Sequence, residues 1–170
     1  MSALSPGFVV VCALLVLAGF AKLRSPSAAS DALSSVALPA SRPLVRALGL
    51  AELVIGAVAA ARPSPVTAGL VAVSYASFCA FVLLARPADC GCFGAATVDS
   101  GPIHALLNGL ACVVAAIAAV VPPPGIGSIV RHDPLIAGSL GLGTAAATFA
   151  AYLAFTALPQ AWHAYGAGSA

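Results

Sequence analysis

"VTAGLVAVSYASFCAFVLLA", residues 66–85, is a stretch of 20 residues without a charged side chain. About 20 predominantly apolar residues are enough for a helix to cross the hydrocarbon core of a bilayer. Backbone polar groups in lipid must be satisfied internally, and this stretch is too long and too uniformly apolar for a barrel strand. It therefore predicts a transmembrane helix.

Four further stretches of similar length and apolarity predict four more spans. The first carries no Lys or Arg ahead of its apolar core, so we expect a permanent helix rather than a cleaved signal peptide. "ARPSP", residues 61–65, predicts a tight turn, because its prolines cannot continue a helix. The predicted fold class is an all-α integral membrane protein, a polytopic helical bundle. The four further spans are about 4–21, 44–61, 103–121 and 135–158.

Small residues and one long connection add detail to the bundle. The spacings Ala47/Ala51 and Ser139/Gly143 predict faces where helices approach closely. The connection 22–43 has too few large apolar residues to span. We expect a short amphipathic or re-entrant piece over the bundle there.

Composition excludes two broad classes of protein. Hydrophobic residues make up 61% of the chain and charged residues 7%, with a mean hydropathy of +1.07. A soluble domain carries roughly a quarter of its residues charged, so lipid is the expected solvent. The net charge is +2 and no basic run with interleaved aromatics is present, which argues against nucleic acid as a partner.

Five spans place the conspicuous polar residues on one side of the bilayer. Lys22 ends the first span on the side of the connection that follows the third span, and His104 begins the fourth span there. Asn108 lies one turn deeper on the same helical face as His104. Glu52 lies about 12 Å inside the second span and needs a partner, for which Lys22 is the nearest counter-charge and Asn108 or His104 the alternatives. A packing clamp and a snorkelling lysine are the structural alternatives.

The connection after the third span contains "ADCGCFGAAT", residues 88–97. Cys90 and Cys92 could close a small, strained disulfide, the kind that tends to be labile or catalytic. They could also be free thiols, or soft-metal ligands with His104 or Asp89, for which Cu(I) suits two thiolates better than zinc. The chain has five cysteines, and those inside apolar runs are expected to be inert hydrophobes. These are Cys12, Cys79 and Cys112.

Several of these features together resemble the MauE family of membrane proteins, within the broader DoxX-like group. They are "GFAKL" at residues 19–23, Glu52 followed by Gly56, "DCGCFGA" at residues 89–95, and Asn108. The resemblance covers about residues 4–121. It implies a four-helix transmembrane domain at 1–121, followed at 122–170 by a Pro/Gly loop, the fifth transmembrane helix and a short tail.

The resemblance also implies a redox-associated function. The namesake of the family supports maturation of the disulfide-rich methylamine dehydrogenase alongside a thioredoxin-like partner. Carried over by position, Cys90 and Cys92 are the exchanging pair. Lys22, Glu52 and Asn108 match family positions without an assigned role. The chain has no thioredoxin domain, so that partner is expected to be a separate protein.

Our main hypothesis is a thiol-disulfide oxidoreductase acting as a membrane relay for extracytoplasmic proteins. Cys90 and Cys92 exchange with a thioredoxin-like protein or a quinone, and Lys22, Glu52, His104 and Asn108 are supporting residues without a resident metal. The helical pocket around Glu52 could host the quinone. The alternatives are a copper-binding or assembly-factor protein without catalysis, and a structural subunit with idle cysteines.

Charge and redox chemistry conflict on sidedness. The positive-inside rule places the cysteine side in the cytoplasm, whereas disulfide formation favours the oxidising outer side. We expect a multi-pass protein of the cytoplasmic membrane with Cys90 and Cys92 outside. The cysteine side carries Lys22, Arg24, Arg42, Arg46 and Arg86, and the opposite side carries Arg62 and Arg131.

Overall fold

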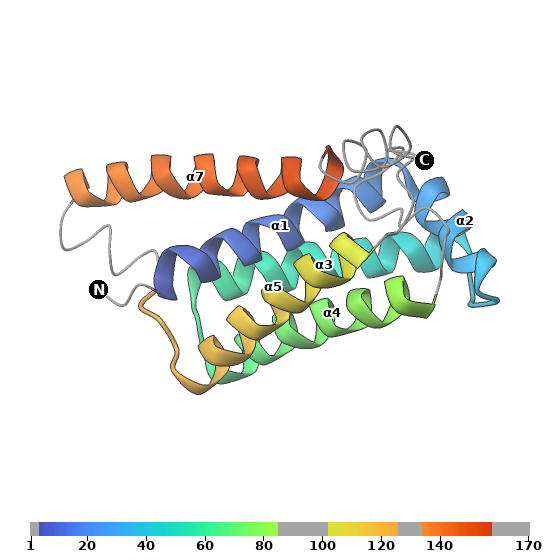
Figure 1. Ribbon diagram of the computed structural model, residues 1–170, viewed down its shortest axis with the longest axis horizontal. Coiled ribbons are helices and arrows are strands. Elements are labelled where there is room, and N and C mark those ends of the chain that lie inside the picture. Colours follow the sequence, from blue (N-terminus) through green and yellow to red (C-terminus); the bar gives the residue numbers. More distant parts are fainter. Residues whose placement is uncertain (1–3, 85–101, 126–133, 158–170) are drawn as a thin grey trace, which may run out of the picture.

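The computed structural model describes residues 4–84, 102–125 and 134–157, and most of these residues are helical. Five of the helices are long and apolar enough to cross a membrane, so the prediction of an all-α polytopic membrane protein is confirmed. Successive spans run in opposite directions along the bundle (Figure 1). The helices are α1 (Leu4–Arg24), α2 (Pro26–Ser35), α3 (Arg42–Ala61), α4 (Pro65–Leu84), α5 (Pro102–Val120) and α7 (Pro134–Thr156).

The α3–α4 turn follows the predicted "ARPSP" break. Helix α3 ends at Ala61 and α4 begins at Pro65, the position where proline's fixed φ suits a helix start. The Ser64 hydroxyl accepts a hydrogen bond from the Thr67 amide at 3.1 Å, and the Ser64 amide donates to the Thr67 hydroxyl at 2.9 Å. This reciprocal cap satisfies two amides that the first turn leaves open. The two spans therefore form a tight transmembrane hairpin.

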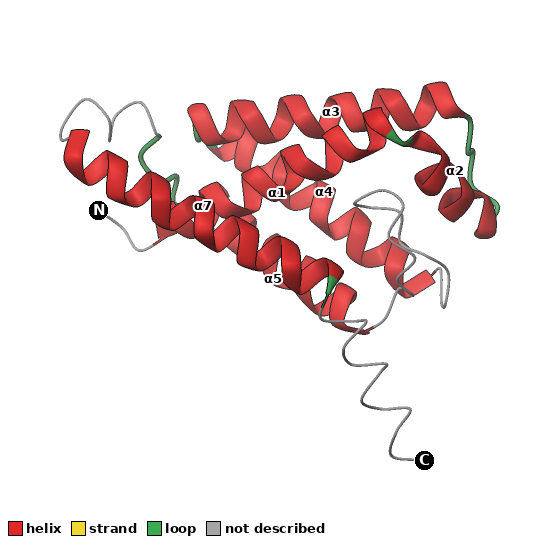
Figure 2. Ribbon diagram, turned by 90° about the horizontal axis from the view of Figure 1, so that it is seen from above, coloured by secondary structure: helices red, strands yellow, loops and turns green. Residues whose placement is uncertain are grey.

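Helix α2 is the short piece expected between the first two spans. It buries Pro26, Ala29 and Ala32, which recur every three residues on one face, and it packs against α1 and α3 at one end of the bundle (Figures 1 and 2). Its C-terminus closes with Ala37 in the left-handed region at a φ of 56°. The Ala37 amide donates to the Ser34 carbonyl and the Leu38 amide to the Leu33 carbonyl, a helix ending that usually takes glycine at the position of Ala37.

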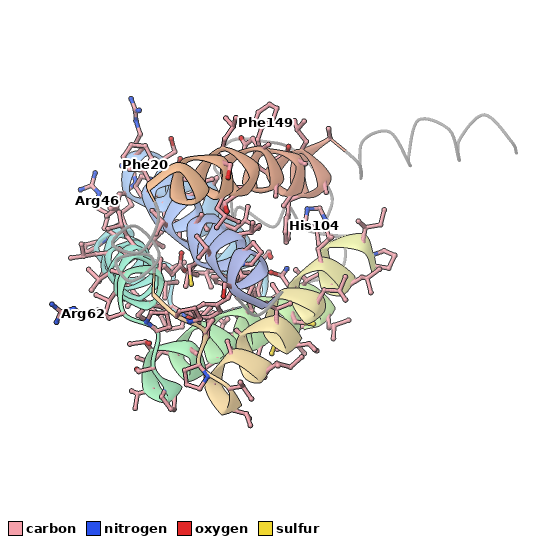
Figure 3. All side chains as sticks on the ribbon, turned by 90° about the vertical axis from the view of Figure 1, so that its left-hand side faces the viewer. Phe20, Arg46, Arg62, His104 and Phe149 are labelled. Carbon is pink, nitrogen blue, oxygen red and sulfur yellow. The ribbon has the colours of Figure 1, made fainter. Side chains whose placement is uncertain are left out.

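Helix α1 is the central and most buried span, with α3, α5 and α7 around it (Figure 3). It packs most closely on α3, because glycines remove side chains from the interface. A Cβ added to Gly49 would lie 2.8 Å from the Gly19 carbonyl oxygen, and one added to Gly56 would lie 2.8 Å from the Cys12 carbonyl oxygen. The expected close face at Ala47/Ala51 is wrong, since both residues are exposed. The backbone approach uses the face of α3 that carries Gly49 and Gly56 instead.

Helix α4 pairs with α5, and α7 lies along α1 on the side away from α4 (Figure 1). Most of the α7 residues whose burial is described are exposed. The close helix approach expected at Ser139/Gly143 is not found, because a Cβ added to Gly143 would meet nothing within 4 Å. The core of the bundle is apolar and comes mainly from the other four spans. It includes Phe8, Cys12, Leu15, Val71, Tyr75 and Ala115.

Candidate functional site

A buried ion pair joins the first two spans. Lys22 Nζ lies 2.7 Å from Glu52 Oε2, and the two residues are 5% and 2% exposed. The close approach of α1 and α3 at Gly49 brings the stem of Lys22 against α3. Glu52 lies ten residues into α3, about 15 Å along its axis, and Lys22 lies two residues before the end of α1. The partner of Glu52 is therefore the counter-charge that the sequence favours, and the Lys22 side chain is buried in the bundle rather than exposed.

One aromatic residue of α4 contacts the ammonium group, and a second one packs against the first. Lys22 Nζ lies 4.9 Å from the centroid of the Phe78 ring, within cation–π distance. The Phe78 ring stands edge-on to Tyr75 at 5.8 Å, and the Tyr75 hydroxyl donates a 2.8 Å hydrogen bond to the Val11 carbonyl of α1. The sequence analysis missed both aromatics. The one available signal was Tyr75, a residue with a polar tip inside an otherwise apolar span.

His104 and Asn108 form a second buried polar pair, on α5. They lie one turn apart on one face, as predicted, and Asn108 Nδ2 donates a 2.8 Å hydrogen bond to the His104 carbonyl oxygen. The His104 imidazole hydrogen-bonds the backbone of Phe155 and meets that ring edge-on at 6.2 Å. Figure 3 shows His104 between α5 and α7. The partner of Glu52 is Lys22 rather than either of these residues.

Adjacent residues of α4 connect the two pairs. Phe78 lies under the Lys22 ammonium, and the next residue, Cys79, has its Sγ 3.5 Å from the carbonyl oxygen of Ala105, the neighbour of His104. The supporting residues therefore gather toward the bundle end where α4 ends and α5 begins. Cys90 and Cys92 lie in the segment that joins those two ends and fall outside the described residues.

Two buried polar atoms have no hydrogen-bond partner in the described part of the chain. They are Glu52 Oε1 and His104 Nδ1. An unpaired buried acceptor costs about 1–3 kcal/mol, and more when it is charged, so such atoms in a bundle core need an explanation. Each polar pair therefore contains one buried atom that can still form a hydrogen bond.

Within residues 4–84, 102–125 and 134–157, no three His, Cys, Asp or Glu residues gather where they could hold a metal ion. The cysteines in these ranges are free thiols. Cys12 is buried, and Cys79 and Cys112 are half-buried. Their positions inside helices fit the small hydrophobes expected from the sequence.

The comparisons with known proteins identify the family of this membrane bundle. The family model described as methylamine utilisation protein MauE matches residues 2–121, which is more than half of the chain. The chain belongs to the MauE family. No curated protein and no solved structure matches it. The region matched by the MauE model contains both polar pairs and the Cys-Gly-Cys sequence, whereas α7 lies beyond it.

Proposed function

We propose that this MauE-family chain is a thiol-disulfide oxidoreductase. Its Cys90 and Cys92 pass electrons between a thioredoxin-like protein and a quinone at one side of the membrane. The observation that carries the proposal is the Cys-Gly-Cys sequence between α4 and α5, inside the family-matched region. Those two helices meet at the bundle end that holds the buried Lys22–Glu52 and His104–Asn108 pairs. Support therefore comes from two cysteines in the connection between α4 and α5 and from the buried polar residues near the ends of those helices.

The proposed exchange begins when the thiolate of one cysteine attacks a disulfide of a thioredoxin-like partner. The partner's S–S bond breaks, a mixed disulfide forms, and one partner thiolate leaves. The second cysteine then attacks the mixed disulfide and releases the other partner thiolate. Cys90 and Cys92 end as a disulfide, the partner has gained two electrons, and its two thiolates each take up a proton. The reverse sequence oxidises a partner dithiol.

A membrane-soluble quinone is the proposed second partner. Oxidation of the Cys90/Cys92 dithiol gives up two electrons and two protons, which together convert a quinone to a hydroquinone. The thioredoxin-like protein is a separate chain in this scheme. Maturation of a disulfide-rich extracytoplasmic protein, such as methylamine dehydrogenase in the namesake system, is the corresponding cellular role.

We propose that the cysteine pair faces the outer side of the cytoplasmic membrane. Lys22 is buried and paired with Glu52, so it carries no weight as a topology marker. Arg24 lies over the Phe20 ring at 5.5 Å, while Arg42 and Arg46 are exposed at the same end and still favour the inner side. Labelling of Cys90 and Cys92 from outside the cell distinguishes the topology that the arginines favour from the topology that disulfide formation favours.

The experiment is differential alkylation in intact cells with a membrane-impermeant maleimide mass tag, before and after reductant. A background in which Cys12, Cys79 and Cys112 are alanine leaves Cys90 and Cys92 as the thiols that are tagged. Tagging that requires reductant and disappears in the Cys90→Ser/Cys92→Ser variant supports the relay. Tagging without reductant, and only after the membrane is broken, contradicts it. Stoichiometric copper that is lost in the same double variant favours the metal-binding alternative.

A further inference from the structure

The Lys22–Glu52 pair offers a matched donor and acceptor that the described part of the chain leaves open. Glu52 Oε2 accepts from Lys22, while Glu52 Oε1 is buried without a partner in the described residues. An ammonium group has three N–H donors, and the described contacts of Lys22 use one N–H on Glu52. A free carboxylate oxygen therefore lies beside a lysine with further donor capacity.

The depth of the pair restricts what can meet this capacity. Glu52 lies about 15 Å along α3, a helix long and apolar enough to cross a membrane, and it is 2% exposed. Bulk water does not reach the hydrocarbon, so a hydrogen-bond donor for Glu52 Oε1 has to come from the lipid phase or be enclosed with the bundle. The Phe78 ring lies beneath the Lys22 ammonium, and the buried Tyr75 ring packs edge-on against Phe78.

A hydroxyl group fits both open positions at once. It donates one hydrogen bond and accepts another, so it can donate to Glu52 Oε1 and accept from Lys22 Nζ. A carbonyl group can accept from Lys22 but has nothing to donate to the carboxylate. The pair thus discriminates between a hydroxyl and a carbonyl on otherwise similar ligands.

We infer that the Lys22–Glu52 pair is the binding site for the hydroxyl end of a membrane-soluble hydroquinone and prefers it to the oxidised quinone. The inference rests on the proposed function and specifies how that function's quinone partner is recognised. The hydroxyl donates to the carboxylate and receives a hydrogen bond from the ammonium. A hydrogen bond to a charged group corresponds to roughly tenfold to a hundredfold in affinity.

The test measures ligand binding in detergent-purified protein carrying Cys90→Ser/Cys92→Ser, so that no thiol chemistry consumes the ligand. The probes are a short-tailed benzohydroquinone, its quinone and its dimethyl ether, kept anaerobic. Affinity is read from the ligand-dependent rise in Tm. We expect the hydroquinone to bind roughly tenfold or more tightly than either of the other two compounds.

Two variants test whether the pair is responsible. Lys22→Met/Glu52→Leu replaces the pair with apolar side chains of similar size, an exchange that bundles often tolerate, and it should remove the preference. Ser77→Ala should keep the preference, because the Ser77 hydroxyl is exposed and bonds to its own helix at the Val73 carbonyl.

Equal affinity for the three compounds, a preference that survives in Lys22→Met/Glu52→Leu, or no Tm rise with any probe would overturn the inference. In the last case an enclosed water is the remaining donor for Glu52 Oε1. The result is separable from the relay itself. Hydroquinone preference in the serine background stands even if labelling shows that Cys90 and Cys92 never form a disulfide, and disulfide formation stands if the preference is absent.

Discussion

Removing one side of the buried ion pair should be far more costly than removing both sides. Glu52→Leu leaves the Lys22 ammonium in the bundle with Phe78 as its described neighbour, and Lys22→Met leaves the Glu52 carboxylate without its counter-charge. Each single change is expected to lower the free energy of unfolding by about 3–5 kcal/mol. The double change should be near neutral or stabilising by about 1–4 kcal/mol, because it removes both desolvated charges.

The expected loss in free energy of unfolding follows from the burial of the two charged groups, not only from the 2.7 Å distance between them. Exposed ion pairs contribute about 0–1 kcal/mol, since water replaces the lost partner. Here the two residues are 5% and 2% exposed, so water replaces a lost partner poorly. For a chain of this length, 3–5 kcal/mol corresponds to a fall in Tm of about 6–20 °C.

The assay is a double-mutant cycle on detergent-solubilised protein, followed by thermal unfolding and by denaturant titration at fixed detergent concentration. The interaction energy is the double change minus the two single changes. Single variants that each cost less than about 1 kcal/mol would refute the reasoning, because they would show that water reaches Lys22 and Glu52. Ser77→Ala, an exposed change on α4, is the control for handling and detergent effects.

Further expectations concern packing, hydrogen bonding and a helix end. Gly49→Ala should destabilise by about 1–3 kcal/mol, because its Cβ would lie 2.8 Å from a backbone oxygen of α1. Gly69→Ala, which meets nothing within 4 Å, should not destabilise; equal melting of the two variants would contradict the close packing. Tyr75→Phe should cost about 1 kcal/mol, seen in the same melts, because the Val11 carbonyl loses its donor, and an unchanged Tm would contradict that bond. Ala37→Gly should stabilise the end of α2 by about 1 kcal/mol, read as slower amide exchange in α2, because glycine accepts a φ of 56° without strain; faster exchange would contradict the left-handed ending.

The spans and the ion pair were predictable because a bilayer makes a few residues decisive. An uncharged run of 20 residues has one stable form in lipid, and two prolines in "ARPSP" mark where it starts. A carboxylate inside such a run must face a partner. The short list of cations near the same membrane side made Lys22 the first choice for Glu52, and the structure shows that pair.

The inward face of α3 was harder to predict from composition. Small residues occur on several sides of this helix, so Ala47/Ala51 was as attractive a spacing as Gly49/Gly56. Glu52 itself was the better guide, because buried positions recur three or four residues from it in both directions. An apolar helix surrounded by lipid gives no other sign of its inward face.

The contacts of α7 were beyond prediction for a related reason. Its exposed and packed residues are equally apolar, so the sequence does not show that Phe155 packs on His104. Helix–helix association in lipid depends on local shape rather than on a general apolar driving force. Long-range contacts of this kind follow from the assembled bundle, not from one helix's pattern.

The order of α1 and α3 along the chain has a consequence for biogenesis. Glu52 would enter the bilayer alone at a cost of about 3 kcal/mol by insertion scales. Lys22 is made 30 residues earlier, at the end of the span that packs on α3 through glycines. The first two spans are thus suited to leave the translocon as a paired unit, with the charge of the second already neutralised by the first.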